Sequence, residues 1–345
     1  MTPRARKVVS AVGRGVLSFG LLALLAYIFR NELGRSFAKI RSAPILPLVL
    51  AASWYVFFIF ISAWRWQVLL QARGLRFSTW YLARVFTLGL FFCKLLPTSI
   101  GGDVMRIAYT APKGRSAEAF SATFLDRLIG FVSLTSLAVV VAIALYFTSP
   151  AWRELSMTLG RLTLSGTGVV VLLAAILLLL VLGTLVLFND AAHRFAVRLF
   201  GGVRLFNIGS TLDKAYGAVK QYRHNRGALA LSFVSGLGVQ AALSFSWFHT
   251  AQAIRGAVPL VYYFVMIPLL NIIVNIPSIG GLGVREASFS AFYVFFSGPL
   301  GAAQQTEAKA TAIAVALLFL ALDLVFAMLG GLLFAVTRRN AGKGV

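Results

Sequence analysis

Long apolar runs separated by short basic segments make up most of the chain. A helix needs roughly 20 apolar residues to cross the hydrocarbon core of a bilayer, and six runs reach or approach that length. The first run is short and follows four basic residues, as in a signal peptide, but no small-residue cleavage site follows it convincingly. We therefore interpret it as a first membrane helix. The pattern predicts full spans at about residues 15–29, 44–64, 128–147, 165–188, 228–248 and 310–336.

Two further apolar segments, residues 80–100 and 259–300, are interrupted by proline, a glycine pair and charge. The first contains Leu95-Leu-Pro-Thr-Ser-Ile-Gly-Gly-Asp-Val-Met-Arg106 and the second Asn275-Ile-Pro-Ser-Ile-Gly-Gly-Leu-Gly-Val-Arg-Glu286. Both signatures keep Ser-Ile-Gly-Gly-x-x-x-Arg. Paired interruptions in the two halves of a membrane protein point to a transport site at the midplane. The alternative is two ordinary Gly-Pro turns that resemble each other by chance. We expect the tips of two hairpins at Pro97, Ser99, Gly101, Gly102, Pro277, Ser278, Gly280 and Gly281.

Composition and charge fit a membrane protein. With 59% hydrophobic and 12% charged residues, the chain has too little charge to cover the surface of a soluble domain. The net charge of +22 comes from basic residues that flank apolar runs and form no stripe, so it indicates cytoplasmic loops and anionic headgroups, not nucleic acid. Our topology places 21 Lys and Arg residues inside and 8 outside. The four basic residues of the outer loop 30–41 depart from this rule.

With this distribution of Lys and Arg residues, each interrupted segment must return to the membrane face from which it entered. We therefore predict an all-α polytopic membrane protein with about six full transmembrane helices plus two opposed re-entrant hairpins in an inverted repeat. The chain forms a single membrane domain, 1–345, with both termini in the cytoplasm. Its parts are an N-terminal helix and loop (1–43), a first half with the signature 95–106 (44–164), a connecting span with a basic cytoplasmic loop (165–227), and a second half with the signature 275–286 (228–345).

The signature arginines are the leading candidates for binding an anion. A helix that restarts after each glycine pair would turn free N–H groups and its positive dipole end toward the hairpin tip. A cation such as Arg106 or Arg285 in such a first turn is repelled by the positive end of the helix dipole. A phosphate bound by both the arginine and the helix end would offset this repulsion. Lys94 lies too deep for easy snorkelling and joins this site. Asp103 is either an N-cap or an i,i+3 partner of Arg106.

The remaining charges in apolar surroundings also need partners. Asp323 lies midway along an apolar run, where a charge costs about 2.5–3.5 kcal/mol on insertion scales. It pairs with Arg285 or Arg106, or it titrates and couples proton movement to transport. Glu286 is favourable in a first turn, and we expect it to point away from its neighbour Arg285. Asp126 and Arg127, just before a span, read as an interfacial ion pair, with a functional role as the alternative.

Metal, redox and hydrolytic chemistry find no support in the sequence. Cys93 is the only cysteine and has the character of a packing residue. Three histidines are scattered without ligand spacing, and no nucleophile–base arrangement or phosphate-binding loop is visible. We expect no cofactor, no metal and no soluble catalytic domain.

An ordered set of motifs resembles a known family. These motifs are Arg65-Trp66 with Leu69-Leu70, Leu96-Pro97 with Gly101-Gly102-Asp103 and Arg106, Asp126-Arg127 with Gly130, and Pro277 with Gly280-Gly281-Leu-Gly283-Val-Arg285-Glu286. Together, over about residues 45–335, they resemble the flippase-like transmembrane region of bifunctional lysylphosphatidylglycerol synthases, which also occurs in free-standing proteins. The resemblance implies a bacterial-type inner-membrane protein that handles polar lipids. Because this chain shows no soluble synthase domain, the resemblance does not carry an aminoacyl transferase activity over to it.

The sequence therefore favours a lipid flippase without enzymatic activity. Its expected partners are membrane lipids, anionic or aminoacylated. The headgroup would be bound by Arg106, Arg285 and Lys94, with Asp103, Glu286 and Asp323 balancing those charges or receiving a cationic group. Arg65, Asp126 and Arg127 are secondary candidates. Two alternatives remain: an integral-membrane transferase acting on a lipid-linked substrate, and a partner subunit of a lipid-synthesising enzyme.

Overall fold

The protein is a bundle of long helices with one small β-hairpin. The computed structural model describes residues 30–95, 100–159, 162–191, 194, 216–217, 220–274, 284–299 and 301–341. In chain order its elements are α2 (Arg30–Arg41), α3 (Ile45–Gln71), α4 (Thr79–Leu95), α5 (Ile100–Thr110), α6 (Ser116–Thr148), α7 (Pro150–Glu154), β1 (Ser156–Leu159), β2 (Leu162–Ser165), α8 (Gly166–Phe188), α11 (Arg226–Gln252), α12 (Leu260–Val274), α13 (Val284–Phe296) and α14 (Ala302–Ala341).

Five helices in the described part of the chain are long and apolar enough to cross a membrane: α3, α6, α8, α11 and α14. They match five of the six predicted spans, and their exposed apolar side chains face outward, as lipid contact requires. The sixth, at residues 15–29, lies outside the described residues. The chain is therefore an all-α, multi-pass membrane protein, as the sequence predicts.

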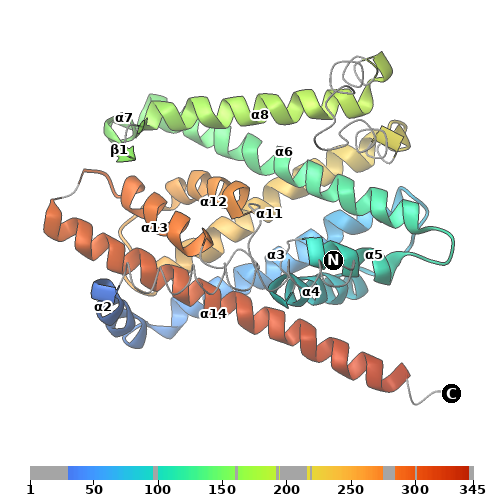
Figure 1. Ribbon diagram of the computed structural model, residues 1–345, viewed down its shortest axis with the longest axis horizontal. Coiled ribbons are helices and arrows are strands. Elements are labelled where there is room, and N and C mark those ends of the chain that lie inside the picture. The colour runs from blue at the N-terminus through green and yellow to red at the C-terminus, as the bar shows by residue number, and fades with distance from the viewer. Residues whose placement is uncertain are drawn as a thin grey trace, which may run out of the picture.

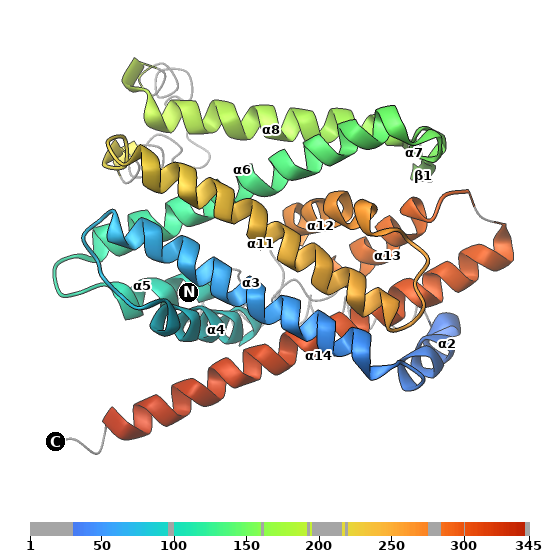
Figure 2. The same ribbon diagram turned by 180° about the vertical axis from the view of Figure 1, so that it is seen from behind.

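Two pairs of shorter helices lie at opposite ends of the bundle. The pair α4 and α5 occupies the end where α3 finishes and α6 begins, whereas α12 and α13 occupy the other end (Figures 1 and 2). At the first end, Arg115 donates from Nη2 to the carbonyl of Arg73 at 2.7 Å, which joins the loops before α4 and after α5. At the second, the hydroxyl of Tyr293 on α13 accepts from the backbone N–H of Ala257, just before α12, at 3.1 Å. Each pair thus returns to the end from which it started, and its re-entry into a membrane stays a prediction.

The packing has the pattern of an inverted repeat. The span α3, the pair α4–α5 and the span α6 correspond to α11, α12–α13 and α14. Corresponding helices pack alike: α14 lies on α4 as α6 lies on α12, and α3 lies along α11. Figure 2 shows α3 and α11 running in opposite directions, as do α6 and α14. The span α8 stands outside this repeat and packs mainly on α6.

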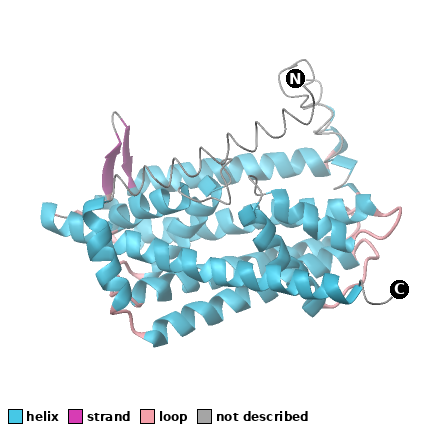
Figure 3. Cartoon of the chain, turned by 60° about the horizontal axis from the view of Figure 1, so that its bottom comes forward, coloured by secondary structure: helices cyan, strands magenta, loops and turns pink. Residues whose placement is uncertain are grey.

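Local sequence signals explain several element boundaries. Ser165 caps α8 by accepting a hydrogen bond from the N–H of Gly168 at 3.0 Å. Gly74 has a φ of 70° after α3, where the N–H of Leu75 bonds to the carbonyl of Leu70 and turns the chain toward α4. Between α6 and α8, the β1–β2 hairpin projects at one end of the bundle (Figure 3).

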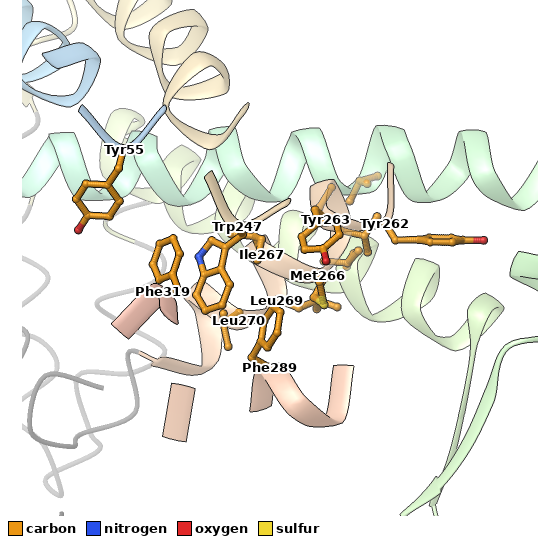
Figure 4. Packing of buried hydrophobic residues seen from close by; sticks show 14 of the residues in the cluster. Tyr55, Trp247, Tyr262, Tyr263, Met266, Ile267, Leu269, Leu270, Phe289 and Phe319 are labelled. Atoms are coloured by element: carbon orange, nitrogen blue, oxygen red, sulfur yellow. The ribbon is translucent and has the colours of Figure 1, made fainter. Parts of the chain in front are cut away.

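Aromatic side chains fill the centre of the second half. Trp247 on α11 stacks on Phe319 of α14 and on Phe289 of α13, with ring centroids 3.8 Å and 4.4 Å apart (Figure 4). All three side chains are almost fully buried. This aromatic block ties the second helix pair to both neighbouring spans, because each ring comes from a different element.

The basic segment 30–41, predicted as an outer loop, is the helix α2, which packs on α14. The Oγ of Ser36 donates to the carbonyl of Ala310 at 2.9 Å, and the Nζ of Lys39 lies 2.6 Å from Glu307. The helix lies at the end of the bundle that carries α12 and α13 (Figure 2). One of its basic residues, Lys39, therefore has its partner on α14.

Candidate functional site

Asp126 on α6 is the centre of the first charge cluster, and its side chain is only 2% exposed. One carboxylate oxygen, Oδ1, accepts a hydrogen bond from Nε of Arg65 at 2.8 Å. The other, Oδ2, accepts from Nη2 of Arg106 at 2.8 Å. Both oxygens are thus paired with guanidinium groups, which is the condition under which a carboxylate can be buried.

The three members of this cluster come from α3, α5 and α6 and are positioned by their neighbours. The guanidinium of Arg106 lies 4.1 Å from the ring centroid of Trp66 and 5.4 Å from that of Phe86, so aromatic faces support the cation. Gly130 lies one turn after Asp126, and a Cβ there would lie 3.2 Å from Nη1 of Arg65. The absence of a side chain at Gly130 leaves room for Arg65 to reach the carboxylate.

Asp103 adds a second carboxylate beside Arg106. It lies in the first turn of α5, which begins at Ile100, so it is not an N-cap. Its Oδ1 is 3.6 Å from Nη1 of Arg106, which is the predicted i,i+3 ion pair. Its Oδ2 pairs with Nε of Arg127. The glycine pair is part of the same first turn, since α5 starts before Gly101 and Gly102.

A cavity of about 360 Å³ opens beside this cluster. Five charged residues among those described line it, Arg65, Asp103, Arg106, Asp126 and Arg127, which leaves one excess positive charge. Two buried polar atoms of lining residues, Nε of Arg106 and Oγ of Ser62, have no hydrogen-bond partner among the described residues. Such unpaired donors in a charged cavity suit an anionic group with several acceptor oxygens.

The second charge cluster is centred on Asp323 of α14, which is 5% exposed. Its Oδ1 accepts from the hydroxyl of Tyr55 at 2.7 Å. Its Oδ2 accepts from Nζ of Lys94 at 2.7 Å and from Nη1 of Arg285 at 2.6 Å. Arg285 also donates to Oε1 of Glu286 from Nε at 3.2 Å and from Nη2 at 3.1 Å. Two cations and two carboxylates balance in this cluster.

The clusters are built alike. In each, a signature arginine on the second helix of a short pair bonds to an aspartate on the next long helix. A buried tryptophan accompanies each arrangement: Trp66 lies under Arg106, and Trp247 stacks on Phe319, whose ring centroid is 5.9 Å from the guanidinium of Arg285. Trp66 lies 40 residues before Arg106 and Trp247 lies 38 before Arg285. This similar spacing is a sequence signal for Trp247, which the motif comparison overlooked, whereas Trp66 already belongs to the first motif.

Several sequence expectations need correction. Asp126 is not part of an interfacial pair with Arg127, because it faces inward and bonds to Arg65 and Arg106. Arg285 and Glu286 do not point apart, since they hydrogen-bond to each other. Arg106 lines the cavity, whereas Arg285 belongs to the separate Asp323 cluster and is not among the lining residues. Asp323 pairs with Arg285, as one expectation had it, and Lys94 joins that pair.

The expected hairpin tips lie largely outside the described residues. Pro97 and Ser99 fall in the first gap, and Pro277, Ser278, Gly280 and Gly281 in the second. Gly102 is described, and its role is close packing, because a Cβ there would lie 2.8 Å from the carbonyl oxygen of Gly89 and 2.6 Å from Sγ of Cys93. No group of three or more His, Cys, Asp or Glu side chains that could bind a metal ion occurs among the described residues.

Comparisons with known proteins were made at the level of sequence and of structure. No curated protein and no solved structure matches the chain. The family model described as the lysylphosphatidylglycerol synthase TM region matches residues 11–331. That match includes both signatures, both charge clusters and the cavity. The chain therefore belongs to the family of lysylphosphatidylglycerol synthase transmembrane regions.

Proposed function

We propose that this protein moves a phosphate-bearing polar lipid across the cytoplasmic membrane, with both termini in the cytoplasm. The observation that carries the proposal is the cavity beside Asp126. Its single excess positive charge matches the single negative charge of a phosphodiester, and the unpaired Nε of Arg106 and Oγ of Ser62 are donors for phosphate oxygens. Membership of a lipid-related membrane family supports the same substrate class.

Asp103 would allow the cavity to bind the headgroup of an aminoacylated lipid as well. It lines the same cavity and is 15% exposed on its side chain, more than Asp126. A headgroup with both an ammonium and a phosphate would place the phosphate at Arg106 and the ammonium near Asp103. An anionic headgroup without an amine would use the arginine side of the cavity alone.

A second cavity, of about 660 Å³, supports passage between the two ends of the bundle. It is lined from α2, α7, α12, α13 and α14, at the end opposite the pair α4–α5, and its charged residues have both signs: Lys39, Arg255, Glu154 and Glu307. The aromatic block of Trp247, Phe289 and Phe319 lies in the second half of the bundle, beside Asp323's partner Tyr55 (Figure 4).

In this mechanism the two cavities open alternately, and the acyl chains stay in the bilayer while only the headgroup follows the polar path. The Asp323 cluster would serve the second half of the transport cycle. In this structure Asp323 pairs with Lys94 and Arg285, and Glu286 pairs with Arg285; opening at that end would free Arg285 for the phosphate. Asp323 would then retain Lys94 and Tyr55 as partners.

A vesicle assay with fluorescently labelled anionic phospholipid tests the proposal. The variant Arg106→Gln removes the phosphate-binding cation from the cavity. Since a hydrogen bond to a charged group contributes about 1.5–3 kcal/mol, we expect transport to slow about tenfold or more. The control is Arg84→Gln, because Arg84 is exposed on the neighbouring helix α4 and lies over Trp80 outside the cavity.

Equal transport rates for both variants and the unaltered protein would refute the role of Arg106. The same assay separates a translocator from a transferase. Lipid recovered afterwards keeps its mass if the protein only moves it. A transferase would yield a lipid of higher mass when supplied with a donor, which mass spectrometry detects.

A further inference from the structure

A second lipid site can be derived from an apolar groove on the other side of α6. The groove has a volume of about 170 Å³ and is lined by residues of α6, α8 and α11: Leu125, Leu128, Ile129, Val132, Thr184, Phe188, Leu229 and Phe233. The hydroxyl of Thr184 donates to the carbonyl of Leu180 at 2.7 Å, so the one polar side chain in the lining is already satisfied. The groove therefore suits a hydrocarbon chain.

Basic residues gather where the groove meets the end of the bundle. Asp190 follows the lining residue Phe188 by two positions, and Arg223 binds it with both terminal nitrogens at 2.7 Å and 3.1 Å. Nζ of Lys220 lies 3.9 Å from the same carboxylate. Arg226 opens α11 one turn before the lining residue Leu229 and is exposed. Asp190 thus interacts with three cations, Arg223, Lys220 and Arg194, so positive charge is in excess around this one carboxylate.

The turn that carries these cations is fixed to the bundle. Tyr222, next to Arg223, is fully buried and donates from its hydroxyl to the carbonyl of Leu69 on α3 at 3.0 Å. The hydroxyl of Tyr216 donates to Asp190. Figure 1 shows the end of α8 and the beginning of α11 close together at this end of the molecule, and Figure 2 shows the same from behind.

We propose that this groove and the cations Lys220, Arg223 and Arg226 bind one anionic phospholipid of the surrounding leaflet as a fixed lipid. One acyl chain lies between α6, α8 and α11, and the phosphate lies against the excess positive charge at the mouth. Basic pockets between transmembrane helices bind anionic headgroups in this way. An uncharged or zwitterionic lipid would fill the groove but leave the cations without an anion.

This site is separate from the cavity of the proposed transport path. Leu125 and Ile129 face the groove, whereas their neighbours Asp126 and Gly130 line the cavity on the opposite face of α6. A lipid bound in the groove would contact α6, the helix that carries Asp126. Its occupancy does not depend on transport, so it can be measured whether or not the protein moves lipid.

Native mass spectrometry of the purified protein tests the site, with phosphatidylglycerol and phosphatidylcholine of identical acyl chains as probes. The variant Val132→Phe fills the groove without changing charge, and Val140→Phe is its control, because Val140 lies on α6 with 64% of its surface exposed. We expect Val132→Phe to lose one tightly bound phosphatidylglycerol and Val140→Phe to retain it. Equal retention in both variants would overturn the groove as the binding place.

Charge variants test the other half of the site. The double variant Lys220→Gln and Arg226→Gln should lose the same phosphatidylglycerol. The control, Arg76→Gln with Lys113→Gln, removes two exposed cations from the same end of the bundle and should retain it. Equal loss in both double variants would show general attraction to a basic surface and overturn the site, as would retention in both. Binding of phosphatidylcholine with equal strength would overturn the requirement for an anion.

Discussion

Asp126 is expected to contribute strongly to the stability of the fold, because its carboxylate pairs with two buried guanidinium groups, those of Arg65 and Arg106. The variant Asp126→Asn leaves buried Arg65 without its carboxylate partner and leaves Arg106 with only the more distant Asp103, whose Oδ1 lies 3.6 Å from Nη1. Breaking a buried ion pair by removing one partner costs about 3–5 kcal/mol. We therefore expect a large drop in the melting temperature of the purified protein in detergent, measured by intrinsic fluorescence.

The partly exposed pair of Arg115 and Glu118 supplies the matched control, with Nε 3.0 Å from Oε1. The substitution Glu118→Gln should change the melting temperature less than Asp126→Asn does, since water screens the charges of a pair that it can reach. Equal effects of the two substitutions would mean that Asp126 is solvated in solution and that the first cluster is not a buried network.

Close packing of α4 depends on glycines in the helices on either side of it. Gly330 of α14 lies so near α4 that a Cβ would be 2.3 Å from the carbonyl oxygen of Thr87. Backbone cannot yield as the end of a side chain can, so Gly330→Ala should push α4 away from α14. Overpacking of this kind costs about 1–3 kcal/mol, and thermal unfolding measures the loss.

Gly183 on α8 is the control for this substitution, because no atom lies within 4 Å of a Cβ added there. Alanine has the higher helix propensity by about 0.8–1.0 kcal/mol, so Gly183→Ala should be neutral or slightly stabilising. A neutral result at Gly330 as well would show that α4 is free to move relative to α14.

The link between α8 and α11 should weaken in acid. The hydrogen bond from Arg223 is the main cause that lowers the pKa of Asp190 from its ordinary value of 3.8. A carboxylate whose pKa is lower in the folded than in the unfolded state stabilises the fold at pH values above its unfolded-state pKa. This stabilisation is lost as the pH falls through the pKa of the folded state. The melting-temperature difference between the unaltered protein and Asp190→Asn should therefore be constant from pH 7 to about 5 and shrink below about 4. A difference that stays constant or grows in acid would contradict the pairing.

At the scale of the whole molecule, the apolar pattern predicted the spans well and the side-chain partners poorly. Five spans and two short helix pairs follow from runs of apolar residues and from Pro-Gly interruptions, which are local features. The bonds from Arg65 to Asp126 and from Tyr55 to Asp323 join residues 61 and 268 positions apart. Only the packing of α3 against α6 and α14 brings these groups together, so no local pattern reveals them.

The same reasoning explains the mistake at α2. Its four basic residues depart from the charge rule in the predicted topology, but that rule counts loops and does not consider a helix that packs along another element. Ser36 and Lys39 find their partners on α14, more than 260 residues later. The signature arginines were identifiable because their motif recurs, whereas Trp66 and Trp247 stand outside the recurring motif.

The opposed helix pairs make a topological prediction that labelling can decide. In a Cys93→Ala background, single cysteines at Arg76 and Lys113 flank the pair α4–α5, and those at Arg255 and Pro299 flank α12–α13; all four residues are exposed. In sealed vesicles, a membrane-impermeant maleimide should reach the first two from one side and the last two from the other. Each pair starts and finishes at one end of the bundle, and the two ends differ. If Arg76→Cys and Lys113→Cys react from opposite sides, α4 and α5 together cross the membrane, and the inverted arrangement on which alternate opening depends is lost.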